Sequence, residues 1–190
     1  MAANKNSSVT MPSREQVETE LSKIKYKKKF RSTLFSTISI LIVVAAAAVL
    51  ISTLFFPVVQ VSGTSMEPAL KNGDVLVLIK SDNVSRGDMC CFAWQNKTLL
   101  KRVVGLPGDV IRIDEEGNVF VNNEQLDEPY VAEKSLGICE IEFPYLVPDN
   151  KIFILGDQRG SSVDSRSNAI GCVGKDQIVG RVIFKVWPLK

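Results

Sequence analysis

The chain of 190 residues contains no histidine. The triad of serine, histidine and aspartate needs an imidazole, so a hydrolytic serine here would need a lysine, a carboxylate or a terminal amine as its base. Zinc is also disfavoured, because the four cysteines show no Cys-x-x-Cys spacing that would replace imidazole ligands. We therefore expect neither a metal nor a cofactor.

The chain also carries no large excess of positive or negative charge. The formal net charge is only +2, and the basic residues concentrate in one run at residues 23–31. A chain so near neutrality, with no second basic patch, is not typical of proteins that bind nucleic acid. We expect no nucleic acid among its partners.

Charge is absent altogether from residues 34–56, LFSTISILIVVAAAAVLISTLFF. At about 1.5 Å per residue, a helix of this length covers the ~30 Å hydrocarbon core of a bilayer. A cleaved signal peptide is the nearest alternative, but the run exceeds the usual length of about 7–15 residues. We predict an uncleaved signal-anchor, with a tail at 1–33, a transmembrane helix at 34–57 and an exported domain at 58–190.

The charges around this run predict its orientation. Basic residues cluster at 23–31 just before it, whereas the first charge after it is Glu67. By the positive-inside rule the N-terminal tail stays in the cytoplasm. The polar residues 1–20 are expected to be mobile. The chain is thus predicted to cross the plasma membrane once, with the lipid bilayer as a partner and residues 58–190 outside the cytoplasm.

The cysteines Cys90, Cys91, Cys139 and Cys172 all lie in the predicted exported domain, where disulfides can form but are not required. Cys90 and Cys91 would point to opposite faces of a strand and could not pair easily with each other. We expect buried thiols, with a bridge between Cys139 and Cys172 as the alternative.

After residue 58 the pattern changes to short β-branched runs separated by Gly, Pro, Asn and Asp, among them VLVLIKS, TLLKRVVG and GRVIFKVW. Residues 110–121, VIRIDEEGNVFV, are typical of a hairpin with its turn at 115–118. The expected fold is mostly β, an antiparallel β-sheet domain carried on one N-terminal transmembrane helix.

One lysine is a candidate for the missing base. Lysine is protonated at neutral pH unless burial against apolar surface lowers its pKa. In TLLKRVVG, strand alternation places Lys101 on the same face as Leu99 and Val103. The alternative is an edge-strand lysine whose ammonium reaches water and discourages aggregation.

Four motifs follow the apolar run in order: GTSMEPAL at 63–70, GDVLVL at 73–78, KRVVGLPGD at 101–109 and GDQRGSSVDSR at 156–166. Together they resemble the boxes of bacterial type I (leader) signal peptidases, the S26 family with a serine and lysine dyad. The resemblance covers nearly all of the chain from residue 58. It implies a hydrolase, a membrane-bound serine endopeptidase that removes N-terminal signal peptides from exported preproteins after small residues.

The resemblance also implies roles for single residues. Ser65 corresponds to the nucleophile, and its backbone N–H to a donor of the oxyanion hole. Lys101 corresponds to the general base, and Ser162 to a serine whose hydroxyl orients the lysine amine. The residues that would brace the loop beside the site are Asp157, Arg159, Asp164 and Arg166.

Three positions depart from the family pattern. Gly63 stands where some members supply a serine hydroxyl to the oxyanion hole, so a second donor is not assigned. Ala69 replaces a usual threonine, and Gly160 replaces a common acidic residue. We expect the last two to change packing more than chemistry.

The substrate would bind as an extended peptide, and we expect the strand DVLVLIK at 74–80 to receive it by β-augmentation. The apolar residues 55–61, FFPVVQV, are expected to bring the site toward the bilayer. The sequence leaves open which preproteins are substrates, which residues line the pockets, and the oligomeric state.

Two other functions fit the sequence less well. A non-catalytic relative could assist the assembly or chaperoning of exported proteins, but it would have no reason to keep both Ser65 and Lys101. A self-cleaving repressor of the related serine and lysine type would need a DNA-binding region where this chain has its apolar run.

Overall fold

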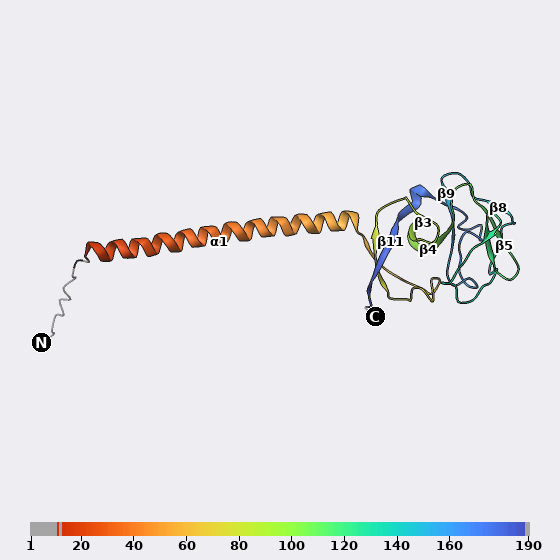
Figure 1. Ribbon diagram of the computed structural model, residues 1–190, viewed down its shortest axis with the longest axis horizontal. Coiled ribbons are helices and arrows are strands. Elements are labelled where there is room, and N and C mark those ends of the chain that lie inside the picture. Colours follow the sequence, from red (N-terminus) through yellow and green to blue (C-terminus); the bar gives the residue numbers. More distant parts are fainter. Residues whose placement is uncertain (1–10, 12, 189–190) are drawn as a thin grey trace. The chain divides into compact units, whose positions relative to one another are not determined.

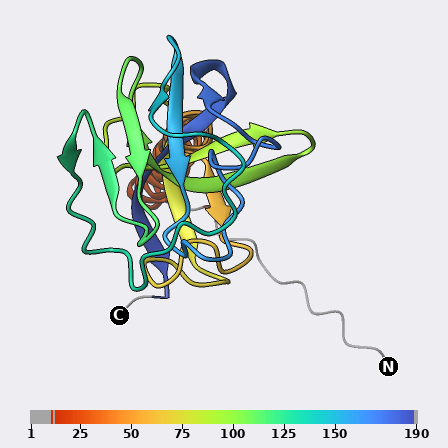
Figure 2. The same cartoon turned by 90° about the vertical axis from the view of Figure 1, so that its right-hand side faces the viewer.

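The computed structural model describes residue 11 and residues 13–188 of the chain, which separates into two units, Met1–Ile51 and Ser52–Lys190. Helix α1 (Arg14–Phe55) runs through the first unit and into the start of the second. The strands all belong to the second unit, shown from two directions in Figures 1 and 2.

Helix α1 has 42 residues and begins at a capping box. The Ser13 N–H donates to Gln16 Oε1 (3.0 Å), and the Gln16 N–H donates to Ser13 Oγ (3.4 Å). The expectation that residues 14–20 are mobile is wrong, because they form the first turns of α1 and include Arg, Glu and Gln, which are strong helix formers. Residues 1–10 and 12 of the expected mobile tail lie outside the described residues.

The apolar part of α1 coincides with the predicted span. Its most apolar window has a mean hydropathy of 2.8 and buries none of its residues, so α1 is long and apolar enough to cross a membrane. The helix ends at Phe55, two residues before the predicted end of the span at 57.

A seven-stranded antiparallel sheet forms most of the second unit, in the order β1-β2-β11-β3-β4-β9-β10. Strands β3 and β4 make a long hairpin that projects from the body of the domain in Figure 2. The strands are β1 (Val58–Gln60), β2 (Val75–Ile79), β3 (Met89–Trp94), β4 (Lys97–Gly105), β9 (Lys151–Leu155), β10 (Val173–Gly174) and β11 (Ile178–Trp187), with a short 3-10 helix η1 (Lys175–Gln177) before β11.

A smaller four-stranded antiparallel sheet has the order β7-β6-β5-β8. Its strands are β5 (Val110–Ile113), β6 (Val119–Val121), β7 (Glu124–Gln125) and β8 (Tyr145–Leu146). Ile113 pairs with Val119 across the turn between β5 and β6, so the predicted hairpin is confirmed. The fold class expected from the sequence, mostly β with one N-terminal apolar helix, is confirmed too.

Strand β4 is buried on both faces at its C-terminal end. Val103 packs with Phe92 and Ile154, whereas the next residue, Val104, packs with Ile111 and other residues that join the two sheets. This burial explains why the end of TLLKRVVG is almost continuously apolar rather than alternating. It also makes β4 a rigid support for the residues that precede Val103.

The four cysteines are free thiols, and no bridge joins Cys139 to Cys172; Cys90 and Cys91 are buried as expected, whereas Cys139 and Cys172 are only half-buried. Cys90 and Cys91 are buried in β3, where loss of hydration raises the pKa of each thiol to about 12. Such thiols stay protonated at neutral pH and are poor nucleophiles.

Candidate active site

Ser65 lies in the loop of residues 61–74 that connects β1 to β2. The Val61 N–H donates to the Asp74 carbonyl (2.8 Å) and closes the base of the loop. Met66, directly after the serine, is only 2% exposed and packs in an apolar cluster. The backbone and the buried methionine thus hold Ser65 in place from both sides.

Lys101 lies on β4 with 4% of its surface exposed. Burial lowers its pKa from an ordinary value of 10.5 to about 8; the charges of Asp164 and Asp157 oppose this shift, and that of Arg166 adds to it. The alternative of a lysine that reaches water is therefore wrong. An amine with this pKa is partly neutral near neutral pH, the state in which it can accept a proton.

A cavity of about 350 Å³ brings Ser65 and Lys101 together. Strand β1 and the loop after it line one side, with Val59 and Ser62 beside Ser65. The first half of β4 lines the other side, with Leu100 next to Lys101. The two candidate residues thus come from a loop and from a strand, and both line one cavity.

Ser162 is buried, and its hydroxyl has no hydrogen-bond partner among residues 13–188. The hydrogen bond to the Lys101 amine that the resemblance implies is therefore absent from this structure. The hydroxyl does lie close to the Ser65 backbone: a Cβ on Gly156 would fall 2.1 Å from Ser162 Oγ and 2.7 Å from the Ser65 carbonyl oxygen. Only glycine at position 156 allows this approach.

Asp164 and Arg166 form a buried ion pair, with Arg166 Nε 2.8 Å from Asp164 Oδ1 and Arg166 Nη2 2.8 Å from Oδ2. Asp164 Oδ2 also accepts the Gly156 N–H (3.0 Å). The Arg166 guanidinium donates to the Arg159 carbonyl (2.9 Å). The pair therefore holds the loop that carries Ser162 in one conformation.

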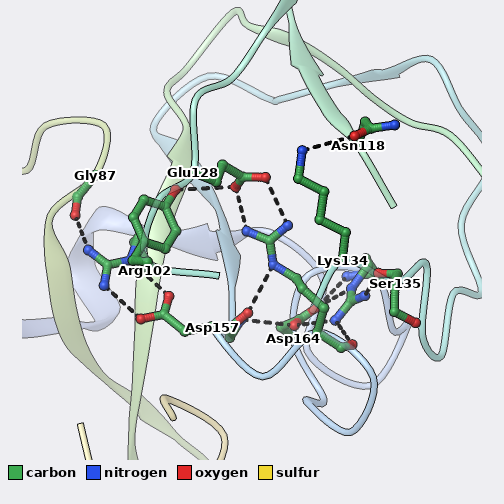
Figure 3. A network of polar contacts seen from close by, with 12 residues as sticks. Gly87, Arg102, Asn118, Glu128, Lys134, Ser135, Asp157 and Asp164 are labelled. Atoms are coloured by element: carbon green, nitrogen blue, oxygen red, sulfur yellow. Dashed lines mark hydrogen bonds and ion pairs between the residues drawn. The ribbon is translucent and has the colours of Figure 1, made fainter. Parts of the chain in front are cut away.

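A second buried network surrounds Arg102, the neighbour of Lys101 on β4 (Figure 3). Arg102 donates twice to Asp157, from Nε (2.8 Å) and from Nη2 (2.6 Å), and once to the Gly87 carbonyl (2.8 Å). Its guanidinium lies 3.9 Å from the centre of the Tyr130 ring. These contacts tie β4 to the loop after β9.

The Tyr130 hydroxyl continues this network by donating to Glu128 Oε1 (3.2 Å). Arg159 donates to both oxygens of Glu128, Nη1 to Oε2 at 3.1 Å and Nη2 to Oε1. Sequence reasoning missed Arg102, Glu128 and Tyr130 as supporting residues. Arg102 could have been suspected, since a cation in a buried strand needs a partner.

The expected place for β-augmentation is wrong. Strand β2 is paired on both edges, with β1 on one side and β11 on the other, so it offers no free edge to a peptide. A free edge lies instead on the first half of β4, because β9 pairs with β4 only from Arg102 onward. This free edge lines the cavity that holds Ser65.

The backbone N–H of Ser65 donates to no acceptor in the described part of the chain. At Gly63 the N–H is already used by Asn72 Oδ1 (3.0 Å), and a side chain at this position would meet open space. The Ser65 amide is thus unengaged, and position 63 offers no side-chain donor.

Comparison with known proteins identifies the family of the chain. Residues 34–187 match the family described as "Signal peptidase, peptidase S26". Signal peptidase I of Bacillus licheniformis is 31% identical over 171 residues, which cover 83% of this chain and 91% of the relative. Signal peptidase I P of Bacillus subtilis subsp. natto is 35% identical over 181 residues, 88% of this chain and 96% of the relative.

Among solved structures, a signal peptidase I from Enterococcus faecalis V583 is 25% identical, covers 53% of this chain and 97% of its own, and has a TM-score of 0.44. The sequence relatives extend over both the apolar helix and the sheet domain, at identities of 31% and 35%. The chain therefore belongs to the signal peptidase family, peptidase S26, and is a peptidase.

Proposed function

We propose that the chain cleaves signal peptides from exported preproteins, with Ser65 as the nucleophile and Lys101 as the general base. The observation that carries this proposal is the burial of Lys101 in the cavity that also contains Ser65. A lysine whose pKa is about 8 can take a proton from a serine hydroxyl where no histidine exists to do so.

In the first half of the reaction, Ser65 Oγ attacks the carbonyl carbon of the scissile bond and its proton passes to the Lys101 amine. The unengaged Ser65 N–H stabilises the oxyanion. The intermediate collapses to an acyl-enzyme as the protonated Lys101 gives its proton to the leaving amine. Water, deprotonated by the same lysine, then hydrolyses the ester and restores Ser65.

Three further residues support this chemistry in the proposal. Ser162, which has a buried and unpartnered hydroxyl, orients the Lys101 amine. Asp164 and Arg166 form the ion pair that holds the Ser162 loop. Each acts on the geometry of the dyad rather than on the substrate.

The substrate would bind as an extended strand between β1 and the free edge of β4. Val103 exchanges backbone hydrogen bonds with residues 87 and 88 on the β3 side, so alternation turns the amides and carbonyls of Leu100 and Thr98 toward the cavity. Such groups bind any extended peptide. Selection for small side chains would then come from the limited volume of the cavity, about 350 Å³.

The basic run at residues 23–31 supports the proposed orientation, and the junction between the anchor and the domain supports a site near the bilayer. The Lys80 N–H donates to the Phe55 carbonyl (3.1 Å), and the Leu78 N–H donates to the Pro57 carbonyl (2.9 Å). The end of the apolar helix is thus bonded to β2, near β1 and the cavity. We infer an arrangement with residues 1–33 in the cytoplasm, residues 34–57 across the membrane and residues 58–190 outside.

The assay uses the full-length chain in detergent with a preprotein that carries a signal peptide. Ser65→Ala and Lys101→Ala should each reduce cleavage by about 10³-fold or more, as expected for removal of a nucleophile or its base. Lys97→Ala removes an exposed lysine from the same strand and should leave the rate unchanged.

Retained cleavage in Ser65→Ala or Lys101→Ala would refute the dyad. A wild-type chain that binds preproteins without cleaving them would instead favour the non-catalytic alternative.

A further inference from the structure

Glu128 is buried outside the four motifs that carry the catalytic residues. Its side chain is 0% exposed, and it follows β7 of the smaller sheet. A buried carboxylate is stable only when cations and hydrogen-bond donors satisfy it. Arg159 and Tyr130 donate hydrogen bonds to the Glu128 carboxylate. Each of them also contacts residues that support the catalytic cavity.

The first route runs through Arg159. This guanidinium is held at one end by both oxygens of Glu128 and donates from Nε to the Gly156 carbonyl (3.1 Å). The backbone of Gly156 is the surface against which Ser162 Oγ and the Ser65 carbonyl lie. The Arg159 side chain thus connects the Glu128 carboxylate to the Gly156 backbone, against which the two serines lie.

The second route runs through Tyr130 to the strand that carries Lys101. The Tyr130 hydroxyl donates to Glu128, and the Tyr130 ring lies against the guanidinium of Arg102. Arg102 adjoins Lys101 and clamps β4 to Asp157. Glu128 therefore contacts side chains that support both halves of the proposed dyad.

We propose that Glu128 is a positioning residue, which aligns Ser65, Lys101 and Ser162 by holding Arg159 and Tyr130. This inference rests on the proposed function, because it concerns the geometry of the same dyad. Glu128 touches neither the cavity lining nor the reacting atoms. Its loss should therefore slow the chemical step while substrate binding is retained.

Glu128→Gln keeps the shape of the side chain and removes its charge. In the full-length chain we expect kcat for preprotein cleavage to fall by about 10- to 100-fold, since small misplacements of catalytic groups have effects of this size. KM should change by less than about threefold. Glu133→Gln makes the same chemical change at an exposed position of the same segment and should match the wild type.

A double-mutant cycle shows whether Glu128 acts through Arg159. If it does, Glu128→Gln combined with Arg159→Gln should be about as slow as the slower single variant, because both changes break one connection. The double variant also removes both buried charges, so it remains a usable measurement if Glu128→Gln alone leaves Arg159 uncompensated and unfolds.

Wild-type kcat in a folded Glu128→Gln or double variant would overturn the proposal. Independent, multiplying losses would overturn the route through Arg159, and a raised KM with unchanged kcat would indicate a role in binding. Failure of the dyad itself would show separately, as activity in Ser65→Ala.

Discussion

At the scale of single residues, the pKa of Lys101 predicts how the rate depends on pH. Only the neutral amine accepts the Ser65 proton, and burial lowers the lysine pKa to about 8. We therefore expect kcat/KM to rise with pH and to level off above pH 8. Measurement of kcat/KM between pH 6 and pH 10.5 tests this. A midpoint near 10 would mean that Lys101 is hydrated like a free lysine.

The same burial predicts an effect on stability. Unfolded Lys101 has its ordinary pKa of 10.5 and native Lys101 a pKa of about 8, so the unfolded state binds more protons between these values. The free energy of unfolding therefore rises with pH across this window, and below pH 8 the buried lysine destabilises the fold.

Lys101→Met should abolish cleavage and raise the free energy of unfolding at pH 7 by about 1–3 kcal/mol, since each unit of pKa shift corresponds to about 1.4 kcal/mol. At pH 10 most of this gain should disappear, because the free energy needed to remove the lysine proton on folding becomes small as the pH approaches the unfolded pKa of 10.5. Denaturant unfolding at the two pH values measures the difference. An equal gain at both would attribute the effect to packing rather than ionisation.

The sequence was sufficient to name the residues that the cavity brings together and insufficient for those that support them. The absence of histidine restricts the base to a few residue types, and the four motifs that resemble those of signal peptidases identify Ser65 and Lys101. The contact of Glu128 with Arg159 depends instead on how the smaller sheet packs against the loop after β9. No local pattern of residues encodes such a contact.

At the scale of elements, Arg102 clamps β4 to the loop after β9, and its removal predicts a large loss of stability. Arg102→Met would leave the carboxylate of Asp157, which is 1% exposed, buried without its cation. We expect the free energy of unfolding to fall by about 3–5 kcal/mol. Arg86→Met breaks a more exposed pair with Asp109 and should lower it by less than about 1 kcal/mol. Similar losses in the two variants, measured by denaturant unfolding, would contradict the clamp.

Strand positions were predictable from alternation and turn residues, whereas strand neighbours were not. The run DVLVLIK was correctly predicted as a strand but wrongly expected to have a free edge. That edge is covered by β11, which lies about a hundred residues later in the chain. Pairing between such distant segments is decided by the packing of the whole domain, which a single-strand pattern does not contain.

At the scale of the whole molecule, residues from Ser52 onward form one compact unit that carries exposed apolar side chains on β1 and β11. Val58 is 62% exposed, Phe184 53% and Trp187 61%. Exposed groups of this size usually mark an interaction surface. Because the anchor enters the unit beside β2, which pairs with both strands, we predict that this surface contacts lipid.

A chain that begins at Ser52 should therefore bind lipid vesicles without most of the helix. Phe184→Ser together with Trp187→Ser should weaken vesicle binding by at least about tenfold, because each buried aromatic contributes roughly 1.5–3 kcal/mol. Leu146→Ser, on the smaller sheet, removes a side chain that is 63% exposed and should leave binding unchanged. Vesicle sedimentation measures the binding, and cleavage of a short soluble peptide confirms that the variants are folded. Equal binding by all three chains would contradict a role of Phe184 and Trp187, and no binding by any of them would assign membrane contact to the helix alone.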